Sequence, residues 1–156
     1  MVCQDVDCII QGNLSTVKAA LLSSGIFQIS GSGVALAAGA IFIDYIRPDG
    51  QKTPVELLRA GEFGPTKLSS SNTIVKNGIR FLNPTEFLRS KVKAWYNRGA
   101  SRDRYDIVWM LKNMSDELDL ERVNPDGELD DLAEIDREVA ELWSELQGEQ
   151  DPEVVD

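Results

Sequence analysis

The chain has 156 residues, of which 42% are hydrophobic, which is the length and composition of one globular domain with a sizeable core. It contains no histidine, and this excludes Ser-His-Asp and Cys-His nucleophile systems as well as zinc or iron sites with histidine ligands. A metal would therefore be bound by carboxylates, the ligands that Mg²⁺ and Mn²⁺ prefer.

The net charge of -10 is unevenly distributed along the chain. Residues 115–156 contain 17 acidic and 2 basic residues, which gives -15, whereas residues 1–114 contain 9 acidic and 14 basic residues, which gives +5. The mildly basic body suits a partner that carries phosphate groups, and the acidic segment suits a solubilising role.

The only two cysteines are Cys3 and Cys8. Their odd spacing would place them on opposite faces of a strand, which disfavours a disulfide bond between them. We therefore expect a reduced, cytoplasmic protein. The longest apolar run, residues 34–43, is about half the length that a helix needs to cross a bilayer, so we expect no membrane contact.

The first half of the chain is predicted to form a series of short elements. In order they are a buried strand over residues 5–10, a helix over 15–22, a strand over 26–30, a strand over 40–47, a turn over 48–51 and a strand over 53–58. Asn13 or Ser15 is the predicted N-cap of the helix. Residues 31–39 fit no element, and residues 60–71 are predicted to form a loop.

The second half begins with the strongest hairpin signal in the sequence. Residues 73–76 and 79–82 flank Asn77-Gly78, a dipeptide that favours a type I′ turn. Three helices are predicted to follow, over residues 84–97, 102–114 and 128–147. The apolar stripe of the third helix consists of Leu129, Leu132, Ile135, Val139, Leu142 and Leu146.

This order of elements predicts an α+β fold, with a small mixed sheet followed by a helical C-terminal part. We expect a sheet region over residues 1–82, a helical region over 83–147 and a disordered tail over 148–156.

The stretch from residue 83 to 112 combines aromatic and basic residues. Its basic residues, seven of the sixteen in the chain, are Arg89, Lys91, Lys93, Arg98, Arg102, Arg104 and Lys112. One predicted apolar row contains Phe87, Leu88, Val92 and Trp95, and the other contains Tyr105, Val108, Trp109 and Lys112. We expect Lys93 and Arg104 to face solvent.

Asp5 and Asp7 are separated by one residue in the first predicted strand, so both carboxylates point to the same face. Two such carboxylates bind one or two divalent cations, and a third acid helps to hold a pair of ions ~3.5–4 Å apart. Glu56, in the middle of a predicted strand, is our first choice for the third acid, and Asp44 is the second.

The spacing of Asp5 and Asp7, followed by the sequence KVKAWYNRGASRDRYDI over residues 91–107, resembles the abortive-infection-type (AbiEii-like) branch of the nucleotidyltransferase superfamily. In that branch a Lys-Leu-x-Ala segment, a spaced arginine and Arg-Asp-x-x-Asp-Leu follow the metal-binding strands. The resemblance covers residues 4–112.

The resemblance implies a metal-dependent transferase, whose substrates are a nucleoside triphosphate and an acceptor hydroxyl on a nucleic acid, a protein or a small molecule. It implies Asp5, Asp7 and Glu56 as catalytic residues that bind Mg²⁺ or Mn²⁺, and Lys91 as a contact to the triphosphate. The residues implied at the far wall of the nucleotide pocket are Arg98, Arg102, Asp103 and Asp106. Arg102 and Asp106 also have the i, i+4 spacing of a simple surface ion pair.

Members of this superfamily carry a Gly-Ser turn before the Asp-x-Asp strand, and its backbone amides bind phosphate. Only four residues precede Asp5. We therefore weigh a shortened enzyme, a homo-oligomer that completes itself through an exposed sheet edge, and a catalytically inactive binding or regulatory module. A different alternative is a partner-binding protein that acts through the acidic helix 128–147.

Overall fold

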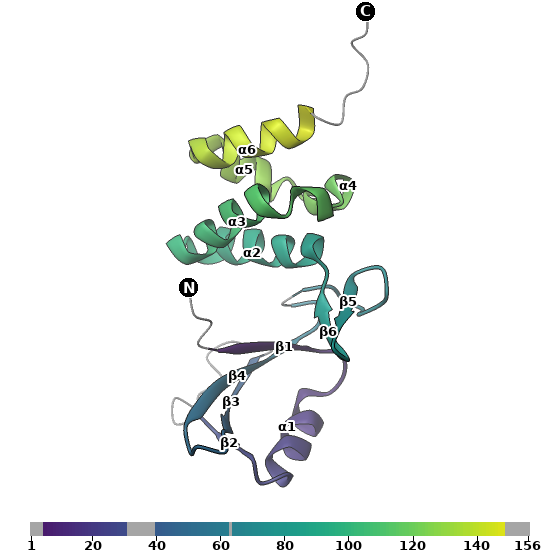
Figure 1. Cartoon of the computed structure of the whole chain (residues 1–156), viewed down its shortest axis with the longest axis vertical. Helices are drawn as coiled ribbons and strands as arrows, with labels where there is room; N and C mark the ends of the chain where they lie inside the picture. The colour runs from purple at the N-terminus through teal and green to yellow at the C-terminus, as the bar shows by residue number, and fades with distance from the viewer. Residues whose placement is uncertain (1–4, 31–39, 63, 149–156) are drawn as a thin grey trace, which may run out of the picture. The chain divides into compact units, whose positions relative to one another are not determined.

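The computed structural model describes residues 5–30, 40–62 and 64–148 and divides the chain into two compact units, residues 1–68 and 69–156 (Figure 1). Cys3, residues 31–39 and the expected tail beyond residue 148 lie outside the described residues. Across the part of the chain that the structure describes, every helix is too short or too polar to pass through a bilayer.

The described residues of the first unit form a four-stranded sheet and one helix. The elements are β1 (Val6–Ile10), α1 (Leu14–Ser23), β2 (Phe27–Ile29), β3 (Ala40–Ile46) and β4 (Lys52–Arg59). The strand order is β1-β4-β3-β2. Strand β1 runs parallel to β4, and the other pairs are antiparallel, so the predicted small mixed sheet is confirmed.

Helix α1 packs against one face of this sheet. Its first residue, Leu14, is buried with Ile43, Val55 and Leu57 in the core of the unit. The N-cap is Asn13, one of the two residues predicted for this position. Its side-chain oxygen accepts a hydrogen bond from the backbone amide of Thr16 in the first turn.

The first strand is less buried than its apolar sequence predicted. Val6 is 46% exposed and Asp7 is exposed. Strand β1 lies at an edge of the sheet and hydrogen-bonds to β4 alone among the described strands, and an edge position leaves more of a strand open to solvent. The predicted strand is therefore confirmed, but the prediction that it is buried was wrong.

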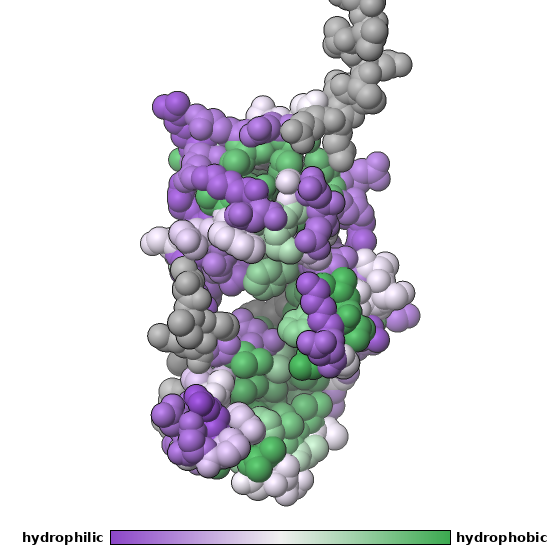
Figure 2. Space-filling view, in the orientation of Figure 1, coloured by the Kyte–Doolittle hydropathy of each residue, from purple (hydrophilic) through white to green (hydrophobic). Residues whose placement is uncertain are grey.

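The second unit begins with a hairpin of β5 (Thr73–Lys76) and β6 (Ile79–Leu82). Asn77 and Gly78 both have positive φ angles, 53° and 78°, as a type I′ turn requires, so the predicted hairpin is confirmed. Val75, Ile79 and Phe81 of the hairpin are exposed, with Ile79 and Phe81 on one face and Val75 on the other. Figure 2 shows hydrophobic surface, coloured green, in the region of the hairpin. The hairpin groups with the helices that follow it rather than with the four-stranded sheet.

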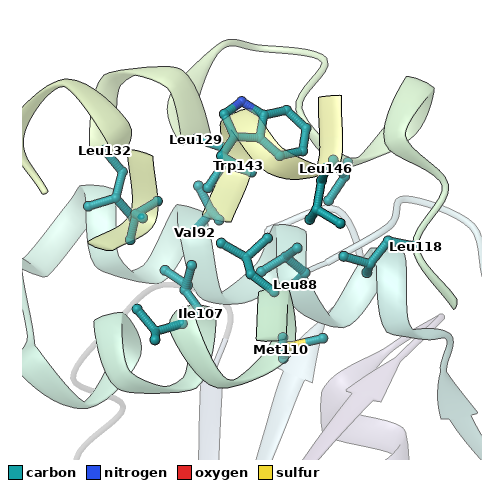
Figure 3. Close-up of a cluster of buried hydrophobic side chains, with 13 residues drawn as sticks. Leu88, Val92, Ile107, Met110, Leu118, Leu129, Leu132, Trp143 and Leu146 are labelled. Atoms are coloured by element: carbon teal, nitrogen blue, oxygen red, sulfur yellow. The ribbon is translucent and has the colours of Figure 1, made fainter. Parts of the chain in front are cut away.

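The described residues after the hairpin, up to residue 148, are mainly helical. The elements are α2 (Pro84–Arg98), α3 (Ser101–Asn113), the 3₁₀ turn η1 (Ser115–Glu117), α4 (Leu120–Val123), α5 (Glu128–Ile135) and α6 (Arg137–Gly148). Their apolar sides form one core (Figure 3). Its buried residues include Leu88, Val92, Ile107, Met110, Leu111, Leu129, Leu132, Val139, Trp143 and Leu146. The predicted α+β order is therefore confirmed.

The single helix predicted over residues 128–147 is wrong, because the chain breaks at Asp136 into α5 and α6. Asp136 has an extended backbone, with φ -127° and ψ 106°. Its side chain accepts hydrogen bonds from the backbone amides of Glu138 and Val139 at 3.1 and 3.2 Å and therefore caps α6. Ile135, placed in the apolar stripe by the prediction, is 73% exposed as a result.

The apolar row predicted for α3 is also wrong. The buried face of this helix carries Ile107, Met110 and Leu111, together with Val108, which was predicted. Tyr105 and Trp109 are instead about half exposed, although a ring of that size is usually largely buried.

Candidate functional site

Three carboxylates meet at the β1–β4 pair. The parallel register places Asp7 opposite Glu56, and Asp5 lies two residues before Asp7, on the same side of the chain. One carboxylate oxygen from each residue lies within 4.8 Å of the other two. Asp7 is exposed, and Asp5 and Glu56 are partly buried. We call Asp5, Asp7 and Glu56 the carboxylate cluster.

Asp44, the second choice for the third acid, is outside this cluster. On β3 it lies opposite Pro54, and it is buried. The Gln28 side chain donates a hydrogen bond to it at 3.3 Å, and the Lys52 ammonium lies 3.9 Å away. Asp44 therefore holds neighbouring strands together, and the geometry favours Glu56 as the third acid.

Three carboxylates at this separation suit a hard divalent cation. Each supplies anionic oxygen, the donor that Mg²⁺ and Mn²⁺ prefer over nitrogen or sulfur, and a cation between them offsets their mutual repulsion. The neighbouring thiol does not suit nucleophilic chemistry, because burial and the Asp7 carboxylate raise the pKa of Cys8 and keep it protonated at neutral pH.

In the second unit, α2 and α3 form a helical hairpin that holds the other candidate residues. The ammonium of Lys91 lies 2.8 Å from the Asp106 carboxylate and 5.3 Å from the centre of the Phe87 ring. Both members of the ion pair are partly shielded from water. The position of the Lys91 charge is therefore fixed by an anion and an aromatic ring together.

A second ion pair closes the link between the two helices. Arg98 donates two hydrogen bonds to Asp103, at 2.6 and 2.7 Å, and Asp103 is completely buried. Between them, Gly99 adopts a left-handed conformation with φ 62°, which glycine tolerates without strain. Such a two-pronged pair fixes the guanidinium plane, so Asp103 holds Arg98 in place. Arg102 is exposed on the first turn of α3.

Arg104 is part of an ion-pair network that the sequence analysis missed. Its guanidinium binds Asp136 and lies 3.0 Å from Glu138, which also pairs with Lys112 at 2.6 Å. These hydrogen bonds lower the pKa of both carboxyl groups and raise the pKa of Arg104. Arg104 was expected to face solvent; its side chain is 36% exposed, and the rest of it is covered. The sequence did contain one signal for this arrangement, the Asp-x-Glu pattern at residues 136–138, which is typical of the start of a helix.

The sequence matches no protein-family model, no curated protein and no solved structure. The geometry of the carboxylate cluster and of the helical hairpin therefore carries the functional argument.

Proposed function

We propose that this protein is a nucleotidyltransferase-like protein of the AbiEii-like type, which uses a divalent cation to transfer a nucleotide from a nucleoside triphosphate to an acceptor hydroxyl. The observation that supports this proposal is the carboxylate cluster. Two of its members alternate along one strand, and the third comes from the adjacent parallel strand. This arrangement directs three acidic side chains at one position on the sheet.

The donor set fits Mg²⁺ or Mn²⁺. Asp5, Asp7 and Glu56 would hold the ion through oxygen atoms that already lie within 4.8 Å of one another. When bound, such an ion neutralises the charge that develops on the phosphate oxygens and aligns the attacking and leaving groups. In the reaction, the acceptor oxygen forms a bond to the α-phosphorus, the bond to the bridging oxygen breaks, and pyrophosphate leaves. A carboxylate or water takes the acceptor's proton.

The helical hairpin of the second unit has basic residues of its own, and Asp103 holds the Arg98 guanidinium in place. The resemblance implies Lys91 as a contact to phosphate and Arg102 as a residue of the nucleotide pocket. Asp106 fixes the Lys91 ammonium through their 2.8 Å ion pair. Charges that are fixed before the substrate binds need less reorganisation during the reaction, which is the basis of electrostatic catalysis.

The proposal is tested by incubating the full chain with labelled nucleoside triphosphates, Mg²⁺ or Mn²⁺, and bulk RNA or the protein itself as acceptor. We expect label transfer that disappears in Asp7→Asn and in Glu56→Gln. Glu62→Gln is the matched control, because it removes an exposed carboxylate of the same unit that pairs with Arg59 at 3.7 Å. Transfer by Asp7→Asn at the wild-type rate would refute the proposal, and metal-dependent nucleotide binding without transfer would instead support an inactive binding module.

A further inference from the structure

Phe42 lies on the same face of the four-stranded sheet as the carboxylate cluster. Its neighbours on β3, Ile41 and Ile43, pack on the α1 side in the core of the first unit, and side chains alternate between the two faces along a strand. Phe42 therefore points away from that core, and it is partly buried.

The strand register places Phe42 beside the carboxylate cluster. Glu56 lies opposite Asp7 on one side and opposite Phe42 on the other. Directly opposite residues on antiparallel strands have Cβ atoms about 4.5–5.5 Å apart, so Phe42 is a direct neighbour of a proposed metal ligand. Asp7, Glu56 and Phe42 thus form one row across β1, β4 and β3.

The sheet surface beside the carboxylate cluster is apolar. Strand β1 is at the edge in the order β1-β4-β3-β2, so the described sheet continues from the cluster only toward β3, where Phe42 lies. Two residues further along β1 and β4, Ile9 and Leu58 lie opposite each other on the same face, and both are partly buried. These side chains offer no ligand to a metal and no donor to a phosphate, so they suit an uncharged part of a substrate.

We infer that Phe42 binds the base of the nucleoside triphosphate, which stacks on its ring while an ion at the carboxylate cluster holds the phosphate groups. This inference rests on the proposed function and assigns the base site that this function requires. A base is joined to its phosphates through a single ribose, so it lies close to the ion that binds them. Every base presents a π surface that stacks on an aromatic ring, so stacking on Phe42 positions the nucleotide with little preference among bases.

The neighbouring carboxylates favour the base of a nucleotide over an apolar protein segment as the occupant. A segment that covered Phe42 would also cover Glu56 and Asp7, and burying unpaired charges is strongly unfavourable. A nucleotide arrives with a divalent cation, which neutralises these carboxylates, while its base covers the Phe42 ring. One ligand thus satisfies both the charged and the apolar parts of the row.

The test is a set of calorimetric titrations of the full chain in the presence of Mn²⁺. The ligands are non-hydrolysable analogues of ATP and CTP and the matching methyl triphosphate, which carries the same phosphate groups and charge but no nucleoside. We expect both nucleotides to bind at least about fivefold more tightly than methyl triphosphate, the smallest gain expected for one stacked base. If methyl triphosphate binds as tightly as both nucleotides, the proposed function stands and this inference is overturned. If none of the three ligands binds, the proposed function fails and the inference fails with it.

Substitutions locate the base at Phe42. Phe42→Leu keeps an apolar side chain and removes the aromatic ring, so it should weaken nucleotide binding by at least about fivefold and leave the binding of methyl triphosphate unchanged. Phe42→Tyr keeps the ring and should retain most of the affinity. Tyr45→Leu is the matched control, because it removes a partly buried ring from the same strand on the opposite face, where Tyr45 packs near Phe27. Stacking on Phe42 is refuted if Phe42→Leu binds the nucleotides as the wild type does, if it weakens the binding of methyl triphosphate equally, or if Tyr45→Leu has the same effect.

Discussion

Replacement of Asp136 tests the explanation for the break between α5 and α6. This side chain has two roles, since it caps α6 through two backbone amides and binds the Arg104 guanidinium. Loss of an N-cap costs about 1 kcal/mol. The Arg104 side chain is 36% exposed, so solvent screening limits the ion pair to about 0.5–1 kcal/mol. Asp136→Ala should therefore lower the free energy of unfolding by about 1.5–2 kcal/mol.

Two further variants separate the contributions. Asn caps helices as well as Asp does, so Asp136→Asn should lose only the ion pair, about 0.5–1 kcal/mol. Glu141→Gln breaks the ion pair with Arg137. The Arg137 side chain is 92% exposed and the Glu141 side chain is 63% exposed, so this substitution should cost less than about 0.5 kcal/mol. This control removes a carboxylate from the same helix without touching the cap.

Urea denaturation followed by tryptophan fluorescence measures these differences. All three tryptophans, Trp95, Trp109 and Trp143, belong to the second unit, so selective excitation reports on this unit even if the two units unfold separately. With a slope of about 1–1.5 kcal/mol per molar urea, Asp136→Ala should move the midpoint down by roughly 1–2 M. If Asp136→Ala costs no more than Glu141→Gln, the assignment of the helix break to this side chain is wrong.

Three other outcomes follow from the structure. Asp44→Asn should retain the rise in melting temperature that Mg²⁺ causes, and Glu56→Gln should lose it, as measured by thermal melts with and without Mg²⁺. If Glu56→Gln retains the rise and Asp44→Asn loses it, the third acid is Asp44. The hydrogen-bonded ion pair with Arg104 lowers the pKa of Asp136 in the folded chain. The stabilisation of the fold by this pair is therefore fully present above the pKa of Asp136 in the unfolded chain, about 3.9, and is lost as the pH falls through the pKa of Asp136 in the folded chain. Asp136→Asn should flatten that acid limb in urea titrations, and an unchanged limb would count against the pair. Gly78→Ala should destabilise the β5–β6 hairpin by about 1 kcal/mol, because φ at this position is 78°, and amide exchange of the hairpin at the wild-type rate would contradict this.

The elements that the sequence predicted correctly are those with local signals. Asn77-Gly78 determines its own turn, Asn13 caps its own helix, and Asp5 and Asp7 share a face because strands alternate. The pairing of Asp7 with Glu56 has no such signal. It depends on the parallel register between two strands about 50 residues apart, and strand periodicity alone did not decide between Glu56 and Asp44.

The errors have physical causes as well. Residues 128–147 have the apolar period of one helix, but the charge of Arg104, more than 30 residues away in the sequence, binds Asp136 at the point where the chain turns. In α3, Tyr105 and Trp109 were assigned to an apolar row because of their helical spacing, and large rings are usually buried. The smaller apolar residues Ile107, Met110 and Leu111 fill that side of the helix instead, and Tyr105 and Trp109 are left at the surface.

The most direct test of the central claim is calorimetric titration of Mn²⁺ into the full chain in the presence of a non-hydrolysable nucleoside triphosphate. We expect the wild-type protein to bind the cation, and Asp7→Asn to bind it at least about tenfold more weakly, because one of three ligands is lost. Glu62→Gln should match the wild type. Equal affinity of the wild type and Asp7→Asn, or the absence of binding to the wild type, would contradict the assignment of Asp5, Asp7 and Glu56 as a metal site.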